Sequence, residues 1–128
     1  MLRLHRSAIE SAIQKSMAVV TYSLNVVQFS LETAYIEGEI VFAEGIRLFF
    51  FEFWQRSGDG TEREKYRFHC MDVDNQLIFR YDNAPHHQNI KTFPHHKHLP
   101  SGIRESMPPA FADVLAETEA YIFGSSLT

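Results

Sequence analysis

Hydrophobic and polar positions follow two different periods along the chain, and the first is that of a helix. Ser7 and Glu10 have the spacing of a capping box, in which two side chains satisfy free backbone N–H groups at a helix start. Apolar side chains follow at helical spacing, at Ile9, Ile13, Met17 and Val20. This pattern predicts a helix over residues 7–19.

A two-residue period follows and indicates β-strands. One phase of this period contains Tyr22, Leu24 and Val26. The opposite phase contains Val27, Phe29 and Leu31. The change of phase predicts a β-bulge between Val26 and Val27, because an extra residue reverses the faces of a strand.

Residues 36–54 are predicted to form a hairpin. Glu44 and Gly45 would be its two-residue turn, with the glycine supplying a positive φ. Opposed residues then have numbers that add to 89, which sets Ile40 against Phe49 and Glu37 against Glu52.

A second hairpin is predicted over residues 65–83, around Asp74 and Asn75. Opposed residues have numbers that add to 149. The apolar pairs are Cys70–Phe79 and Phe68–Tyr81, and the polar pairs are His69–Arg80 and Arg67–Asp82. Because a one-residue slip would mix these faces, the register is well specified.

Residues 84–108 contain four prolines and little periodicity, and they are predicted to form a long loop. A second helix is expected over residues 109–122, with Gly124 ending it. Its apolar stripe is Phe111, Val114, Leu115, Thr118 and Ile122. The expected fold is a single α+β domain over residues 1–128, with a mostly antiparallel sheet of about five strands flanked by an N-terminal and a C-terminal helix.

Composition fits a folded domain, with 45% hydrophobic and 22% charged residues. A single cysteine, Cys70, excludes an internal disulfide and a multi-cysteine zinc finger. The chain shows no signal peptide and no apolar run long enough to span a membrane, so a cytoplasmic location is expected. The net charge of −4 argues against a nonspecific nucleic-acid binder, although residues 76–104 are locally basic.

Five of the seven histidines lie within residues 86–98. Histidine exchanges protons near neutral pH and is a common metal ligand, so three interpretations stay open. The histidines could be solvated loop residues, or they could contact phosphate and carry acid–base chemistry. They could also hold zinc, with ligands drawn from His86, His95, His96 and His98.

The polar side of the second hairpin adds further candidates, because Arg67, His69, Arg80 and Asp82 would share one face. Glu52 would join them if the two hairpins present one continuous side. Flanked by aromatic residues and opposed to Glu37, Glu52 is expected to have a raised pKa, as suits a general base or acid. Base stacking is a weaker possibility for the aromatic side chains of Trp54, Tyr66, Tyr81 and Phe93.

The chain resembles the TumE-like toxins of bacterial and archaeal toxin–antitoxin systems. The resemblance rests on YIEGEIVFAEGIRLFFFEF at residues 35–53, KYRFHCMDVDNQLIFRYDNAPHH at residues 65–87 and FPHHKHLP at residues 93–100. It implies a small ribonuclease-type toxin that is neutralised by an antitoxin, often a helix-turn-helix protein. The positions that match are Glu52, Tyr66, His69, Arg80, Tyr81, Asp82, Asn83, His86, His95, His96, Lys97 and His98.

The leading hypothesis is a metal-independent endoribonuclease toxin without a cofactor. Glu52 or His69 would be the base, His96 or His98 the acid, Arg80 and Lys97 would hold the phosphate, and Asp82 would orient a neighbour. The catalytic candidates are Glu52, His69, Arg80, Asp82, His86, His95, His96, Lys97 and His98. The RNA-binding candidates are Tyr66, Arg67, Tyr81, Asn83 and Lys91. The alternatives are a zinc-dependent nuclease or hydrolase and a non-enzymatic protein-binding module, and a homodimer is possible in each case.

Overall fold

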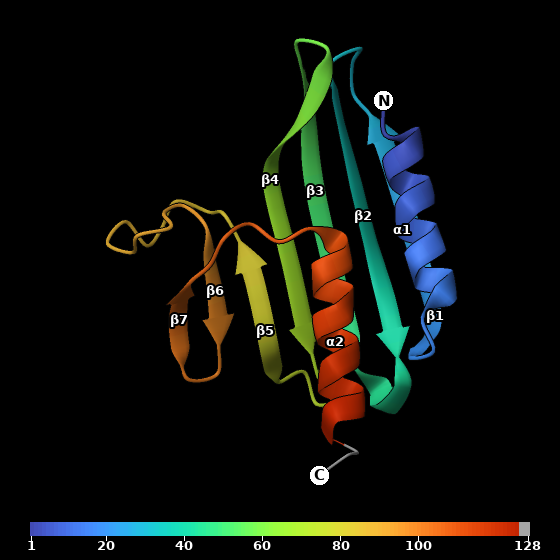
Figure 1. Ribbon diagram of the computed structural model, residues 1–128, viewed down its shortest axis with the longest axis vertical. Helices are drawn as coiled ribbons and strands as arrows, with labels where there is room; N and C mark the ends of the chain where they lie inside the picture. The colour runs from blue at the N-terminus through green and yellow to red at the C-terminus, as the bar shows by residue number, and fades with distance from the viewer. Residues whose placement is uncertain (126–128) are drawn as a thin grey trace.

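The computed structural model describes residues 1–125 of the chain, with two α-helices and one sheet (Figure 1). The helices are α1 (Arg3–Lys15) and α2 (Phe111–Ser125), and a short 3-10 turn, η1, covers Ala43–Gly45. The strands are β1 (Val19–Gln28), β2 (Thr33–Phe42), β3 (Arg47–Ser57), β4 (Gly60–Met71), β5 (Leu77–Asp82), β6 (His96–Leu99) and β7 (Gly102–Glu105). Each strand pairs antiparallel with the next. The α+β prediction is confirmed, with seven strands in place of about five.

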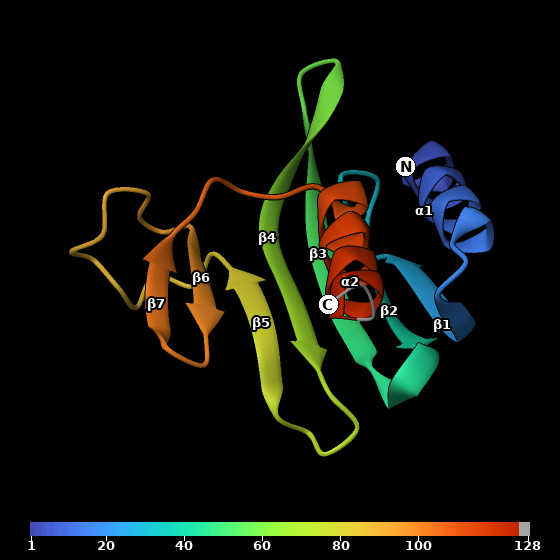
Figure 2. The ribbon, with the colours of Figure 1, turned by 60° about the horizontal axis from the view of Figure 1, so that its bottom comes forward.

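Both helices lie on the same face of the sheet (Figures 1 and 2). The core forms between them and the sheet, where Ile9 and Ile13 of α1 are buried. The predicted stripe of α2 is buried throughout, at Phe111, Val114, Leu115, Thr118 and Ile122. Within residues 1–125 no helix covers the opposite face of the sheet, and we call it the open face. None of the described helices is long and apolar enough to cross a membrane.

The helix ends differ from the predicted ones. The first helix begins at Arg3, so Ser7 lies inside it and caps nothing, and its end at Lys15 leaves Met17 93% exposed. The chain turns out of the helix at Ser16, whose extended backbone leads into β1. The second helix begins at Phe111 and continues through Gly124, so that glycine does not end it.

The predicted bulge between Val26 and Val27 is wrong. These residues pair in unbroken register with Ile36 and Tyr35, and the register shifts instead between Val19 and Thr21. Because Val27 and its partner Tyr35 lie on the open face beside other aromatic side chains, an apolar residue there needs no change of phase.

The register of the first hairpin is also wrong by one residue. Opposed numbers add to 88, which pairs Ile40 with Leu48 and Ile36 with Glu52. The loop holds three residues instead of two, with positive φ at Glu44 (65°) and Gly45 (75°). A one-residue slip reverses every side chain of a strand, so Glu52 faces the helices.

The register of the second hairpin is confirmed, with Arg67 opposite Asp82 and His69 opposite Arg80. The predicted long loop, by contrast, contains β6 and β7. These strands have four residues each and lie among prolines, which leaves too short a run for periodicity to reveal. Since alternate residues of a strand face opposite sides, β6 places His96 and His98 on one face of the sheet and Lys97 on the other.

Candidate active site on the open face

The antiparallel register assembles two rows of side chains across the open face. Directly opposed residues of neighbouring strands point to the same side of a sheet. One row, running from β2 to β6, is Glu37, Phe51, Arg67, Asp82 and His96. The next row is Glu39, Phe49, His69, Arg80 and His98. Six of the sequence candidates therefore share one surface: Arg67, His69, Arg80, Asp82, His96 and His98.

Asp82 lies at the centre of the contacts on this surface, and it is almost fully buried. One carboxylate oxygen lies 2.9 Å from Nε2 of His96 and accepts a bond from the backbone N–H of Ala84, and the other accepts a bond from Nε of Arg80 at 2.9 Å. Burial raises the pKa of Asp82. The bonds from Ala84 and Arg80, with the charges of His96 and Arg80, outweigh burial and hold that pKa below its ordinary value.

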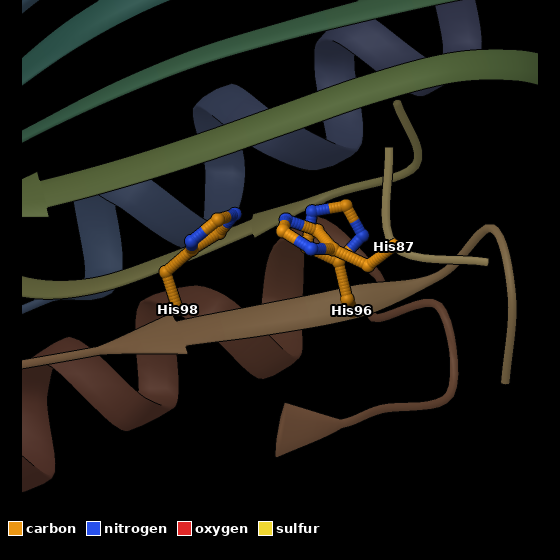
Figure 3. A group of neighbouring side chains, drawn as sticks. All are labelled: His87, His96 and His98. Atoms are coloured by element: carbon orange, nitrogen blue, oxygen red, sulfur yellow. The ribbon is translucent and has the colours of Figure 1, made fainter. Parts of the chain in front are cut away.

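Three imidazoles gather beside this carboxylate, from His87 in the preceding loop and from His96 and His98 on β6 (Figure 3). Ring centroids are 4.8 Å apart for His87–His96 and for His96–His98. They line a cavity of about 350 Å³ together with the exposed His86, and with His69 and Arg80. Four histidines of the predicted cluster therefore reach one site.

A zinc ion bound by the three imidazoles would compete with contacts that His96 already makes. The ligand nitrogens of the three lie within 4.8 Å of one another, and zinc with bonds of about 2.0–2.1 Å sets its ligands roughly 3.4 Å apart. Both nitrogens of His96 already face acceptors, Asp82 Oδ1 and the carbonyl of Pro94, each at 2.9 Å. A zinc ion at His96 would replace one of those two bonds.

His69 and His98 face the same cavity with lowered pKa values. Burial lowers the pKa of His69, and the nearby Arg80 and Arg67 lower it further. Burial also lowers the pKa of His98; the Asp82 carboxylate opposes the shift, and the neighbouring cations reinforce it. His69 is therefore mainly neutral at pH 7, as a proton acceptor requires, whereas only the protonated fraction of His98 could donate a proton.

Glu52 lies on the opposite face, among the core residues. Its two carboxylate oxygens bind Nε2 of His5 at 2.7 Å and a guanidinium nitrogen of Arg63 at 2.8 Å. Burial raises the pKa of Glu52, but the bonds and charges of His5 and Arg63 outweigh it and lower the pKa. The predicted raised pKa and the predicted pairing with Glu37 are both wrong, because the register of the hairpin differs.

Four further candidates lie on the helix side of the sheet. The hydroxyl of Tyr66 bonds Nδ1 of His95 at 2.9 Å, and the two rings stack. Lys97 donates to Glu117 of α2 at 2.7 Å, and Glu117 also accepts the hydroxyl bond of Tyr81. Glu52, Tyr66 and His95 line a separate cavity of about 400 Å³ with His5, Arg63 and Trp54.

The remaining candidates have simpler positions. Asn83 binds the backbone of β4, accepting from Tyr66 N–H and donating to the carbonyl of Glu64. Lys91 is exposed in the loop before β6. Arg67 is exposed on the open face, with its guanidinium 6.0 Å from the ring centroid of Phe51.

Four residues in these contacts were not among the catalytic or RNA-binding candidates predicted from sequence: His87, His5, Arg63 and Glu117. His87 could have been included because it follows His86 directly in the histidine cluster. His5, Arg63 and Glu117 lie on other elements, and their contacts depend on how α1, β4 and α2 pack. No pattern in the sequence predicts such contacts.

Comparison with known proteins supplies the family. A model of the family described as Toxin TumE matches residues 9–122, nearly the whole chain. Searches of the curated proteins and of the solved structures return no significant match. The match begins within α1, ends within α2 and includes every strand of the sheet, with the open-face rows. The chain therefore belongs to the TumE toxin family, whose members are toxins of toxin–antitoxin systems, and a cognate antitoxin is its implied partner.

Proposed function

We propose that this toxin is a metal-independent endoribonuclease that cleaves single-stranded RNA in the cytoplasm. One observation carries the proposal: Arg80 lies between His69 and His98 in a single row of the open face. Neighbouring strands are about 4.8 Å apart, so the two histidine backbones are about 10 Å apart. A phosphate held by Arg80 would lie within reach of both imidazoles.

The row supplies the groups that RNA cleavage by an internal hydroxyl needs. His69 takes the proton of a ribose 2′-OH, and the oxygen attacks the adjacent phosphorus. The bond to the 5′-oxygen breaks, and His98 protonates that leaving oxygen. Arg80 stabilises the negative charge on the phosphorane that forms during this step. The products are a 2′,3′-cyclic phosphate and a 5′-hydroxyl.

The surroundings support this division of roles. His69 lies beside two guanidinium groups, Arg67 and Arg80, which favour its neutral, proton-accepting form. Nε2 of His98 is 3.6 Å from Asp82, whose charge opposes the lowering of the His98 pKa and so increases the fraction of the protonated form that an acid requires. His96 is only 1% exposed and bonded at both nitrogens, so it positions Asp82.

A zinc-dependent nuclease or hydrolase is the second candidate, and the grouping of His87, His96 and His98 favours it. In that mechanism the metal would activate water, and the 2′-OH would be dispensable. The two candidates therefore differ in their need for both the metal and the hydroxyl.

Cleavage of a short single-stranded RNA tests the proposal. Purified toxin is incubated with the RNA and with its fully 2′-O-methylated twin, with and without EDTA. His69→Ala, His98→Ala and Arg80→Gln are compared with Arg3→Gln, which removes an exposed cation of α1. Circular dichroism establishes that each variant is folded.

Cleavage in EDTA that leaves a cyclic phosphate is expected, with losses of about 10²–10⁴-fold in the histidine variants. Arg3→Gln should cleave like the wild type. Cleavage of the methylated strand, or activity that EDTA abolishes and zinc restores, would establish the metal-dependent candidate instead. Full activity in His69→Ala and His98→Ala would refute the row as the catalytic site.

A further inference from the structure

A groove made of three neighbouring hollows crosses the open face and ends at the histidine cavity. It consists of three hollows of about 310, 250 and 350 Å³. The first and second hollows share Phe51 and Arg67, and the second and third share Arg80, Asp82 and Ala84. The groove thus follows the two open-face rows from β1 and β2 to β6.

We propose that this groove binds a single strand of RNA and holds a guanine base in its first hollow, between Phe51 and the carboxylates of Glu37 and Glu39. The inference rests on the proposed function, because it assigns the substrate track of the same site. RNA and not the antitoxin is the expected occupant, because neighbouring hollows share lining residues and the last hollow contains the row of His69, Arg80 and His98.

Phe51 lines the first hollow, and a cluster of aromatic rings lies beside it. Phe51 lies half-buried with its ring centroid 5.5 Å from that of Tyr35, and Tyr35 lies 5.2 Å from Phe29, which is 60% exposed. Phe53 extends the cluster, at 6.2 Å from Phe29. Bases stack on exposed rings of this kind in proteins that bind single strands, with little dependence on sequence.

Apart from Asp82, which contacts Arg80 and His96, the charges on the groove divide by strand and so orient the RNA. Lys65, Arg67 and Arg80 lie on β4 and β5, which gives the phosphates a cationic path toward the catalytic row. Glu37 and Glu39 lie on β2 and line the first hollow with Ser23 and Asn25. Carboxylates repel phosphate, so this end accepts a base.

The two carboxylates also select among bases. A carboxylate only accepts hydrogen bonds when ionised, so it favours a base edge with donors. Guanine offers two adjacent donors, N1–H and the N2 amino group, on an edge that single-stranded RNA exposes. The first hollow therefore prefers guanine over adenine, whose corresponding edge has an acceptor beside its amino group.

Binding of 2′-O-methylated strands tests the track without cleavage. Fluorescence anisotropy is measured with labelled short strands that carry one guanine or one adenine among pyrimidines. The variants are Phe51→Ala, Phe51→Leu, Arg67→Gln and the double variant Glu37→Gln with Glu39→Gln. Arg3→Gln and Tyr121→Ala are matched controls on the helices, Tyr121 being 49% exposed, and thermal melting verifies each fold.

Both Phe51 variants should bind about tenfold or more weakly, because Leu keeps apolar bulk but offers no ring face. Arg67→Gln should weaken both strands and reduce the salt dependence of binding. The double glutamine variant should lose the guanine preference, and the helix controls should match the wild type. Unchanged affinity in the Phe51 and Arg67 variants would overturn the track, as expected if the groove receives a protein. Equal wild-type affinity for both strands would overturn the guanine site.

His98→Ala separates this inference from the proposed catalysis. It should cleave the unmodified strand about 10²–10⁴-fold more slowly, while its affinity for the methylated strand should fall far less than that of the Phe51 variants. If the wild type cleaves RNA but the Phe51 and Arg67 variants bind the methylated strand as well as it does, the RNA track is refuted and the nuclease is not. If those variants bind more weakly but the wild type does not cleave RNA, the nuclease is refuted and the track is not.

Discussion

Nε2 of His96 lies 2.9 Å from Oδ1 of Asp82, and both side chains are buried. This pair joins the first residue of β6 to the last residue of β5, which are direct partners in the sheet. It also closes the loop of residues 83–95 at its base. The contact between Asp82 and His96 thereby holds β6 beside β5, and with it the position of His98 at the cavity.

Asp82→Asn tests this relationship. The amide keeps the shape of the side chain, but it removes the charge that His96 and Arg80 face. The free energy of unfolding should fall by about 1–3 kcal/mol, and cleavage should fall because Arg80 loses its anchor. Urea unfolding and single-turnover cleavage measure the two effects, with Asp59→Asn in an exposed turn as the control. Wild-type stability in Asp82→Asn would show that the pair does not hold β6.

The pH dependence of cleavage follows from the lowered pKa of His69. A base loses function as pH falls through its pKa, so the acidic limb of kcat/KM should have its midpoint below pH 6.5. Arg67→Gln removes one cation that lowers this pKa and should move the limb toward higher pH. Profiles at constant ionic strength measure the shift. An acidic limb above pH 6.5 in the wild type would contradict His69 as the base.

Glu52 should matter for stability and not for cleavage. Glu52→Gln leaves Arg63 without its buried counter-charge, which should cost about 3–5 kcal/mol of unfolding free energy at pH 7. Because the folded pKa of Glu52 is lowered, its contribution is present above pH 4.5 and is lost as pH falls through the folded value. Urea unfolding of both proteins from pH 7 to strongly acidic pH should show the difference shrinking. Loss of cleavage in folded Glu52→Gln would return Glu52 to the catalytic candidates.

Two glycines give opposite predictions. A Cβ at Gly38 would lie 2.6 Å from the backbone oxygen of Ser23 and 2.7 Å from Cε1 of Phe50, so Gly38→Ala should destabilise the protein by about 1–3 kcal/mol. Gly124 lies within α2 with nothing near its Cβ position, and Gly124→Ala should stabilise by about 0.5–1 kcal/mol. Thermal melting of the two variants measures both effects. Equal melting temperatures would contradict the close approach of β1 to Gly38.

The parts of the fold that were predicted from sequence are those in which local pattern and burial agree. In the second hairpin, each face has one character, apolar at Phe68 and Phe79 and polar at Arg67 and Asp82, so only one register buries the right side. In the first hairpin, apolar residues occur on both faces, since Phe49 and Phe51 lie on the open side. Periodicity could not choose there, and a loop longer by one residue decided the register.

The sequence by itself determined that histidines, arginines and one aspartate would meet, because His69, Arg80 and Asp82 lie on one hairpin and the other histidines follow closely. Tertiary structure decided which of them share a face. The short strand β6 sends His96 and His98 to the open side and Lys97 to the helices, and His95 stacks on Tyr66. That division depends on pairing with β5 and on packing against α2. Both bring together residues distant in sequence, so no local pattern encodes them.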